Sequence, residues 1–207
     1  MNQMPPDSES PTQVTALRVA RAIDLAAFVG TELAPGRWRS VTQDEVDRFV
    51  ALTGDRNWVH TDAERAKREL DGGTTIVPGQ LLLALVPALL QEAYVIVGAA
   101  QSRAAVLRAV RFRYPVRPGG MFRLRARLTL VEQRPGFVQV DASCDLEMNS
   151  GQRALTSQRT DVFFRLRKAH RARFTAPAIK RAYDYRIKTL VVVLQIEPCP
   201  CRRIVRY

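Results

Sequence analysis

Hydrophobic and polar residues follow two different periods along this chain, and the change of period falls near Val106. Apolar residues at helical spacing before this point predict four helices, over residues 14–28, 42–52, 63–70 and 79–90. Alternating apolar and polar residues after it predict four strands, over residues 107–116, 122–133, 137–148 and 154–166. The pattern therefore predicts an α+β fold with the helices first and the sheet after.

The helix that starts at Gly79 is apolar on every face, which is typical of a helix enclosed by protein. Pro87 is expected to kink or end it. Short segments rich in Pro and Gly separate the strands, so consecutive strands are expected to pair as antiparallel hairpins in a meander. The predicted arrangement is an antiparallel sheet wrapped around the long apolar helix.

Composition places the chain among globular proteins. It has 207 residues, of which 46% are hydrophobic and 25% charged, and this length predicts one domain with some appended sequence. We predict a disordered leader at 1–13, a folded domain at 14–167 and a basic tail at 168–207. The three cysteines form no paired CxxC motifs, so neither a metal site nor a disulfide framework is expected. No apolar run reaches the roughly 20 residues of a membrane span, and we expect a cytoplasmic protein.

The net charge of +12 is concentrated toward the C-terminus, where 12 of the 32 Lys and Arg residues but only 2 of the 20 acidic residues follow residue 164. Such a segment suggests an arm that binds nucleic acid or an anionic membrane surface. Two other interpretations fit its composition better: an extension packed on the domain, or a change of reading frame that replaced the original C-terminus. Nucleic-acid binding is therefore expected only if it occurs through this tail.

The segment GDRNWVH at 54–60 gathers polar side chains around an apolar centre. A carboxylate (Asp55) and an imidazole (His60) in such a loop can bind one water molecule between them and move protons near neutral pH. The same residues also have structural interpretations. Asp55 and Asn57 are common turn formers, and His60 fits equally well as a core histidine with satisfied hydrogen bonds.

This segment and the residues after it resemble the MaoC-like dehydratases, the (R)-specific enoyl-CoA hydratase group of the hot-dog fold. The resemblance is carried by Thr53-Gly54-Asp55, Asn57, His60, Gly72-Gly73, Ile76-Val77-Pro78-Gly79 and VRFRYPVRPGG at 110–120. The sequence around Asp55 is most similar to the nodulation-protein-N-like branch. Two positions depart from the family pattern, because Pro78 stands where histidine is frequent and Ala84 where serine is frequent, and both bear on substrate preference.

The resemblance implies a hydro-lyase that adds water to trans-2-enoyl-CoA to give (R)-3-hydroxyacyl-CoA, or catalyses the reverse dehydration. Asp55 and His60 are then the acid and base, with the assignment between them open. The backbone N–H of Gly79, at a helix N-terminus, is expected to stabilise charge on the thioester oxygen. Asn57 is expected to orient the substrate or the catalytic groups. Coenzyme A enters as part of the substrate, so no cofactor is expected.

Further residues are candidates for binding the substrate. Leu82, Leu83 and Val86 are candidates for lining an acyl tunnel, although core packing is the more frequent role of such residues. Alternating arginines at 111, 113 and 117 (Arg111, Arg113 and Arg117) are candidates for the coenzyme A phosphates, although such a row is more often a solvated face. The family resemblance also implies a homodimer, which satisfies an open sheet edge.

Two other functions remain open. A hot-dog thioesterase typically places a carboxylate on the long helix, and no acidic residue occurs between Gly79 and Gln91. The other alternative is a non-catalytic acyl-CoA-binding protein that keeps the fold without the reaction.

Overall fold

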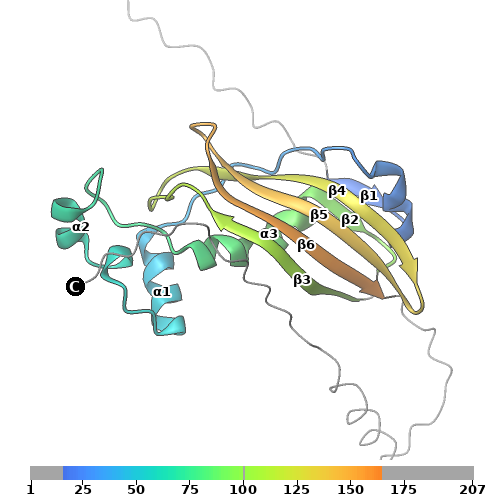
Figure 1. Ribbon diagram of the computed structural model, residues 1–207, viewed down its shortest axis with the longest axis horizontal. Helices are drawn as coiled ribbons and strands as arrows, with labels where there is room; N and C mark the ends of the chain where they lie inside the picture. The colour runs from blue at the N-terminus through green and yellow to red at the C-terminus, as the bar shows by residue number, and fades with distance from the viewer. Residues whose placement is uncertain (1–15, 100, 165–207) are drawn as a thin grey trace, which may run out of the picture. The chain divides into compact units, whose positions relative to one another are not determined.

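The computed structural model describes residues 16–99 and 101–164 (Figure 1). The predicted leader and tail lie outside the described residues, so the domain boundaries stay predictions. The described elements are, in order, β1 (Leu17–Val19), η1 (Ala22–Phe28), α1 (Gln43–Thr53), η2 (Trp58–His60), α2 (Ala63–Glu69), α3 (Gly79–Ala93), β2 (Tyr94–Ile96), β3 (Gln101–Phe112), β4 (Phe122–Arg134), β5 (Phe137–Met148) and β6 (Arg153–Phe164).

Three of the four predicted helices form as α-helices, and α1 begins as its sequence indicates. The Thr42 side chain accepts the Glu45 backbone N–H, and the Glu45 carboxylate accepts the Thr42 N–H at 2.8 Å, which completes a capping box. The helix ends at Gly54, whose φ of 71° is a left-handed conformation that costs glycine little. Residues 54–62 therefore leave α1 in a defined direction, and these residues include Asp55 and His60.

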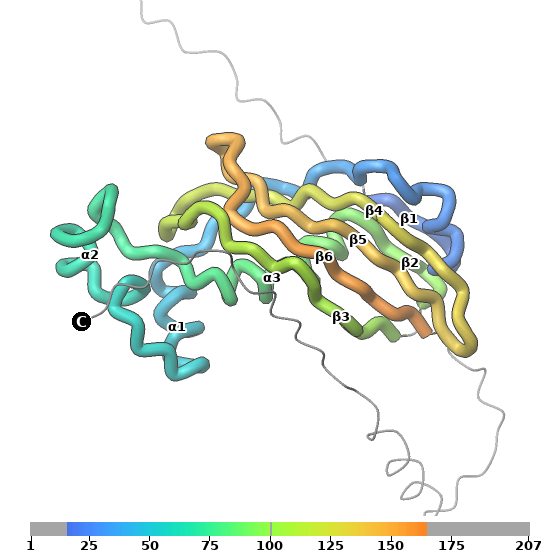
Figure 2. Tube along the Cα trace, in the orientation of Figure 1, coloured from blue at the N-terminus to red at the C-terminus, as the bar shows by residue number. Residues whose placement is uncertain are grey.

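Four long antiparallel strands form one sheet in the order β3-β6-β5-β4. The pairs β4–β5 and β5–β6 are the hairpins that the sequence predicts. The predicted pairing of the first strand with the second is wrong, because β3 pairs with β6 and lies on the opposite edge from β4 (Figure 2). The reason lies in the connection, where the Val116 carbonyl accepts the Val77 N–H and the Gly119 N–H donates to the Val41 carbonyl. This segment braces the entry to α3 instead of turning a hairpin.

The two edges of the sheet differ. The outer edge of β4 is covered by residues 30–39, since the N–H groups of Gly30, Leu33 and Gly36 donate to carbonyls of β4. Within the described residues no strand pairs with the outer edge of β3, which is exposed along almost its whole length. Apolar side chains, including Leu107 and Phe112, are exposed there.

Helix α3 lies behind the sheet in Figure 1 and packs on its inner face. Its buried residues are Leu82, Val86, Leu89, Leu90 and Ala93. The expectation of a fully enclosed helix is wrong for the described chain, because Ala84 and Ala88 are exposed. Pro87 does not end the helix, which continues to Ala93. One face of α3 is thus core, and another is open.

The helix predicted over 14–28 is corrected. Its described part, from residue 16 onward, is not one α-helix, since β1 pairs in parallel with β2 and is followed by the 3-10 helix η1. Farther along, Arg39 makes a single bridge with Phe122 of β4. In both places the chain pairs with distant segments, which the local pattern does not encode.

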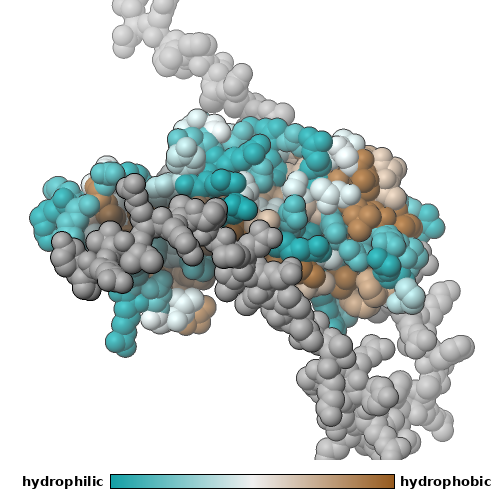
Figure 3. Space-filling model, viewed as in Figure 1, coloured by the Kyte–Doolittle hydropathy of each residue, from teal (hydrophilic) through white to brown (hydrophobic). Residues whose placement is uncertain are grey.

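Neither α3 nor any other described helix combines the length and apolar character required to cross a membrane. On the face shown in Figure 3, apolar surface gathers at the end of the sheet opposite α1 and α2. An exposed apolar side chain, Val97, follows β2 at 64% exposure.

The capping box generates a stability prediction. Thr42→Ala removes the oxygen that accepts the Glu45 N–H, so the free energy of unfolding should fall by about 1 kcal/mol. Urea denaturation measures it. Thr42→Ser keeps the hydroxyl and should stay within about 0.5 kcal/mol of the wild type. Equal losses in both variants would mean that the cap does not stabilise α1.

Candidate active site

The candidate acid–base residues lie on one short loop between α1 and α2. The Asn57 backbone N–H donates to Oδ1 of Asp55 at 2.9 Å, and the Asn57 side chain accepts the Val59 N–H at 3.4 Å as the N-cap of η2. These local bonds form the turn that brings His60 back toward Asp55. Asn57 therefore shapes the loop through both its backbone and its side chain.

Asp55 and His60 face each other. Nε2 of His60 lies 3.8 Å from Oδ2 of Asp55, while the other oxygen of Asp55 is occupied by the Asn57 N–H. The His60 side chain is 12% exposed and that of Asp55 39%. One carboxylate oxygen of Asp55 and one ring nitrogen of His60 thus lie near each other, and the distance between them is longer than a direct hydrogen bond.

The other ring nitrogen fixes the orientation of His60. Nδ1 lies 2.7 Å from the Ile76 carbonyl, and the Ile76 N–H donates to the Val59 carbonyl at 2.9 Å. A backbone carbonyl only accepts, so Nδ1 carries the proton and Nε2 keeps its lone pair when the ring is neutral. The segment that leads into α3 therefore sets both the position and the tautomer of His60.

Gln43 and Thr75 belong to this support, and no sequence pattern points to either. Nε2 of Gln43 donates to the His60 carbonyl at 2.8 Å, and the buried Thr75 hydroxyl donates to Oε1 of Gln43 at 2.5 Å. The bonds join residues 17 and 32 positions apart, which no local pattern reveals. Gln43 thus attaches the first turn of α1 to the His60 loop.

Gly79 is the first residue of α3, with Pro78 as its N-cap. Among the described residues no acceptor takes the Gly79 N–H, whereas the N–H groups of Leu81 and Leu82 both donate to the Pro78 carbonyl. A side chain at this position is hindered, because a Cβ on Gly79 would lie 2.6 Å from the Phe112 ring. Within the described residues the Gly79 N–H is therefore a free backbone donor at the positive end of a helix dipole.

His60 and Gly79 line the same cleft, which has a volume of about 280 Å³. Phe112 and Tyr114 form part of its wall from the end of β3. Phe112 is 51% exposed and was not a candidate from the sequence. Alternation along a strand shows which face of the sheet a residue is on, but not whether that face lines a cleft. The cleft is the space in which a ligand can reach both the imidazole and the free N–H.

Only one of the three predicted acyl-binding residues lies at the cleft. Leu82 lines the cleft, whereas Leu83 and Val86 do not. Val86 is 1% exposed and belongs to the core, and Leu83 packs against that core while partly exposed.

The three predicted phosphate-binding arginines also lie in different surroundings. Arg113 lines the cleft, and Arg111 is exposed on β3 nearby. Arg117 is already engaged, since its guanidinium donates to the Thr74 hydroxyl at 3.0 Å and to the Asp71 carbonyl. It braces the loop around Gly72 instead of presenting a free guanidinium.

Over residues 16–99 and 101–164 there is no group of three or more His, Cys, Asp or Glu side chains arranged to bind a metal ion. The chemistry that the arrangement supports is proton transfer by a carboxylate and an imidazole next to a backbone donor for a developing negative charge.

The chain is similar to known proteins in sequence and in fold. Residues 24–149 match the family model described as MaoC like domain. The chain is 38% identical over 126 residues to 3-hydroxyacyl-thioester dehydratase Z of Mycobacterium tuberculosis H37Rv, covering 60% of this chain and 83% of that protein. It is 36% identical over 66 residues to Nodulation protein N of Rhizobium leguminosarum bv. viciae, covering 32% of this chain and 41% of that protein.

Among solved structures, the (R)-hydratase PhaJ1 of Pseudomonas aeruginosa superposes with a TM-score of 0.53 at 23% identity, covering 66% of this chain and 81% of that one. This likeness confirms the predicted hot-dog fold.

The bond to Ile76 generates a prediction about the His60 ring. His170→Gln leaves His60 as the single histidine of the chain, so its ring nitrogens can be assigned directly by ¹⁵N NMR. In mildly alkaline buffer Nδ1 should carry the proton and Nε2 should have the shift of an unprotonated nitrogen. The same sample unfolded in urea is the control, since the Ile76 contact is then lost. A folded protein with the proton on Nε2 would contradict the geometry.

Proposed function

The chain belongs to the MaoC-like dehydratase family, and we propose that it adds water to trans-2-enoyl-CoA thioesters to give (R)-3-hydroxyacyl-CoA, or catalyses the reverse dehydration. The observation that carries this proposal is the convergence of Nε2 of His60 and Oδ2 of Asp55, 3.8 Å apart, beside a cleft that also contains Gly79. An imidazole, a carboxylate and a free N–H are the groups that hydration of an enoyl thioester requires.

In this mechanism the attacking water lies between His60 and Asp55. Nε2 has the free lone pair, so it accepts a proton from the water as the oxygen bonds to C3 of the substrate. Oδ2 of Asp55 accepts a hydrogen bond from the other O–H of this water and so orients the water for attack. The His60 imidazolium then returns its proton to C2, which restores the neutral ring, so one water is consumed and no other proton source is required.

The Gly79 N–H stabilises the charge that develops on the thioester oxygen during this addition. It is uncommitted within the described residues and lies at the first position of a 15-residue helix, where the dipole favours negative charge. Glycine also lets the thioester approach the backbone closely. Asn57 contributes indirectly, by fixing the carboxylate of Asp55 through its backbone N–H.

Coenzyme A binds, in this proposal, at the outer mouth of the cleft. Arg113 lines the cleft and Arg111 is exposed two positions earlier, and neither makes a salt bridge within the described residues. Both are therefore available for charge-assisted hydrogen bonds to phosphate. Arg117 is engaged with Thr74 and Asp71 and acts by holding the neighbouring loop. No separate cofactor is needed, and the location we propose is the cytoplasm.

We propose a homodimer that pairs through β3. The outer edge of β4 is occupied by residues 30–39, whereas the β3 edge has backbone groups without a partner in the described part of the chain and exposed apolar side chains such as Leu107, 44% exposed. A second copy placed there satisfies both the backbone and the apolar surface. It also lies beside Phe112, at the wall of the cleft.

His60→Ala and Asp55→Asn should each lower the hydration rate by about a hundred-fold or more, because each removes one of the two groups that bind the water. The loss of enoyl-thioester absorbance with short and medium trans-2-enoyl-CoA substrates measures this. Asp44→Asn is the matched control, since Asp44 is 69% exposed and, within residues 16–99 and 101–164, pairs only with Arg48 on the outside of α1.

Wild-type rates in folded His60→Ala and Asp55→Asn proteins would contradict the assignment. A wild-type protein that binds acyl-CoA but hydrates none of the substrates would instead favour the non-catalytic acyl-CoA-binding alternative.

Leu107→Lys should convert the dimer into a monomer, because it places a charge on the edge where the second copy is proposed to pair. Light scattering after size-exclusion chromatography measures the mass. Leu130→Lys is the control, since Leu130 is similarly exposed, at 37%, on β4 at the other edge. A wild-type protein with the mass of one chain, or a Leu107→Lys protein that remains dimeric, would rule out this interface.

A further inference from the structure

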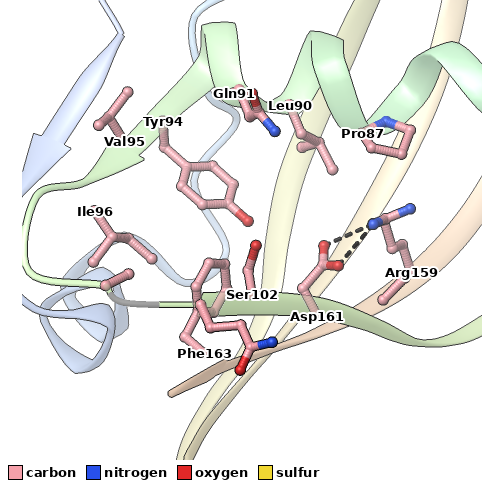
Figure 4. Close-up of a pocket in the computed structure, with 13 residues that line it drawn as sticks. Pro87, Leu90, Gln91, Tyr94, Val95, Ile96, Ser102, Arg159, Asp161 and Phe163 are labelled. Carbon is pink, nitrogen blue, oxygen red and sulfur yellow. Dashed lines mark hydrogen bonds and ion pairs between the residues drawn. The ribbon is translucent and has the colours of Figure 1, made fainter. Parts of the chain in front are cut away.

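A second cavity lies along α3, farther from its N-terminus than the cleft at His60 (Figure 4). Its volume is about 660 Å³, within the usual range of ligand pockets. Leu90 and Tyr94 line it from the end of α3 and the start of β2, and Arg159 and Asp161 line it from β6. The His60 cleft is also lined from α3 and β6. Along α3, Gly79 and Leu90 are separated by about 16 Å at the helical rise.

The floor of this cavity contains a buried ion pair. Nε and Nη2 of Arg159 donate to the two carboxylate oxygens of Asp161 at 2.7 and 2.8 Å, with both side chains about one-tenth exposed. Burying two charges is costly, and hydrophobic residues of similar volume often serve stability equally well or better. The pair is thus a polar feature that core packing alone does not call for.

A hydroxyl without a partner faces the same space. Tyr94 is 7% exposed, and its hydroxyl donates to no other described residue. Figure 4 shows this hydroxyl directed into the cavity toward Asp161 and Ser102. Burial, reinforced by the nearby Asp161 charge, raises the pKa of Tyr94, so the phenol remains a hydrogen-bond donor. The ring of Tyr94 is buried, but its hydroxyl has no hydrogen-bond partner among the described residues and so can donate to a ligand in the cavity.

We propose that this cavity binds the distal end of the acyl chain and selects substrates that carry a neutral oxygen group there, a hydroxyl or a ketone. The inference rests on the proposed function, because it places the thioester at His60 and Gly79 and the chain along α3. The Tyr94 hydroxyl donates to the substrate oxygen. Asp161 accepts from a substrate hydroxyl with the oxygen capacity that Arg159 leaves free.

The charge of the site decides against an ionised group. Arg159 and Asp161 neutralise each other through two parallel hydrogen bonds, so the cavity offers no unpaired positive charge for a carboxylate. A second carboxylate would be repelled by Asp161, and an ammonium group by Arg159. An unsubstituted chain end is also disfavoured, because it removes water from Tyr94 and the ion pair without replacing its hydrogen bonds.

Calorimetric titration of the full chain with saturated acyl-CoA analogues tests this preference without relying on catalysis. Dodecanoyl-CoA is compared with its ω-hydroxy and ω-carboxy derivatives. The ω-hydroxy compound should bind about five-fold more tightly than dodecanoyl-CoA, the ratio expected for one net hydrogen bond. The ω-carboxy compound should bind more weakly than either.

Two variants locate the preference. Tyr94→Phe removes only the hydroxyl and should abolish the five-fold advantage. Replacing both charged partners, as Arg159→Met with Asp161→Leu, avoids leaving a single buried charge and should reduce the advantage, because the Tyr94 hydroxyl still donates but no carboxylate accepts from the substrate hydroxyl. Ser150→Ala, in the exposed turn between β5 and β6, is the control and should keep the wild-type ratio.

Hydration of crotonyl-CoA, whose chain is too short to reach the cavity, separates the two proposals. Equal affinities for dodecanoyl-CoA and its ω-hydroxy derivative would overturn the distal site whether or not crotonyl-CoA is hydrated. An advantage that survives in Tyr94→Phe would overturn the role of the cavity. No hydration of any enoyl-CoA, with the affinity ratio intact, would overturn the proposed reaction and leave the distal site supported.

Discussion

The candidate site depends on one pair of contacts between two segments that the fold brings together: the His60 ring on the Ile76 carbonyl, and the Ile76 N–H on the Val59 carbonyl. They attach the polar loop to the segment that enters α3. The next residue, Val77, donates to the Val116 carbonyl in the connection that leaves β3. Because Gly79 follows two positions later, the imidazole and the helix N-terminus cannot move independently, which is the rigidity that acid–base chemistry requires.

The same connection explains why the sheet has unequal edges. If residues 113–121 formed a hairpin, β3 and β4 would be neighbouring strands. Val116 would then lie in the hairpin turn instead of accepting the hydrogen bond from Val77. The chain instead crosses from one edge of the sheet to the other. The crossing segment supports the site and leaves β3 at the edge, paired with β6 on its inner side and with no described strand on its outer side. An exposed strand with apolar side chains is an aggregation risk for a single chain. The organisation of the site and the exposed β3 edge, where we propose that a second copy pairs, therefore have one structural origin.

Local patterns were sufficient wherever the physical cause is local. The capping box of Thr42 and Glu45, the span of β5 and the grouping of Asp55 with His60 each involve residues within one element or loop. The choice of β6 as partner of β3 was not predictable, because the turn residues after β3 resemble those of a hairpin. Gln43, too, is a supporting residue only because the fold brings α1 beside the His60 loop.

The inner face of β6 shows most directly where periodicity stops being informative. Alternation places Arg159 and Asp161 on the same face as Leu155, and a pattern of polar-out residues assigns such charges to solvent. In the structure they are buried opposite Ala142 and Val140 of β5, close to a Cys144 thiol whose pKa burial raises to about 12. Charges retained in such a place require partners. Arg159 and Asp161 are partners of each other, and the cavity beside them also contains a Tyr94 hydroxyl with no hydrogen-bond partner among the described residues, which favours a polar ligand there.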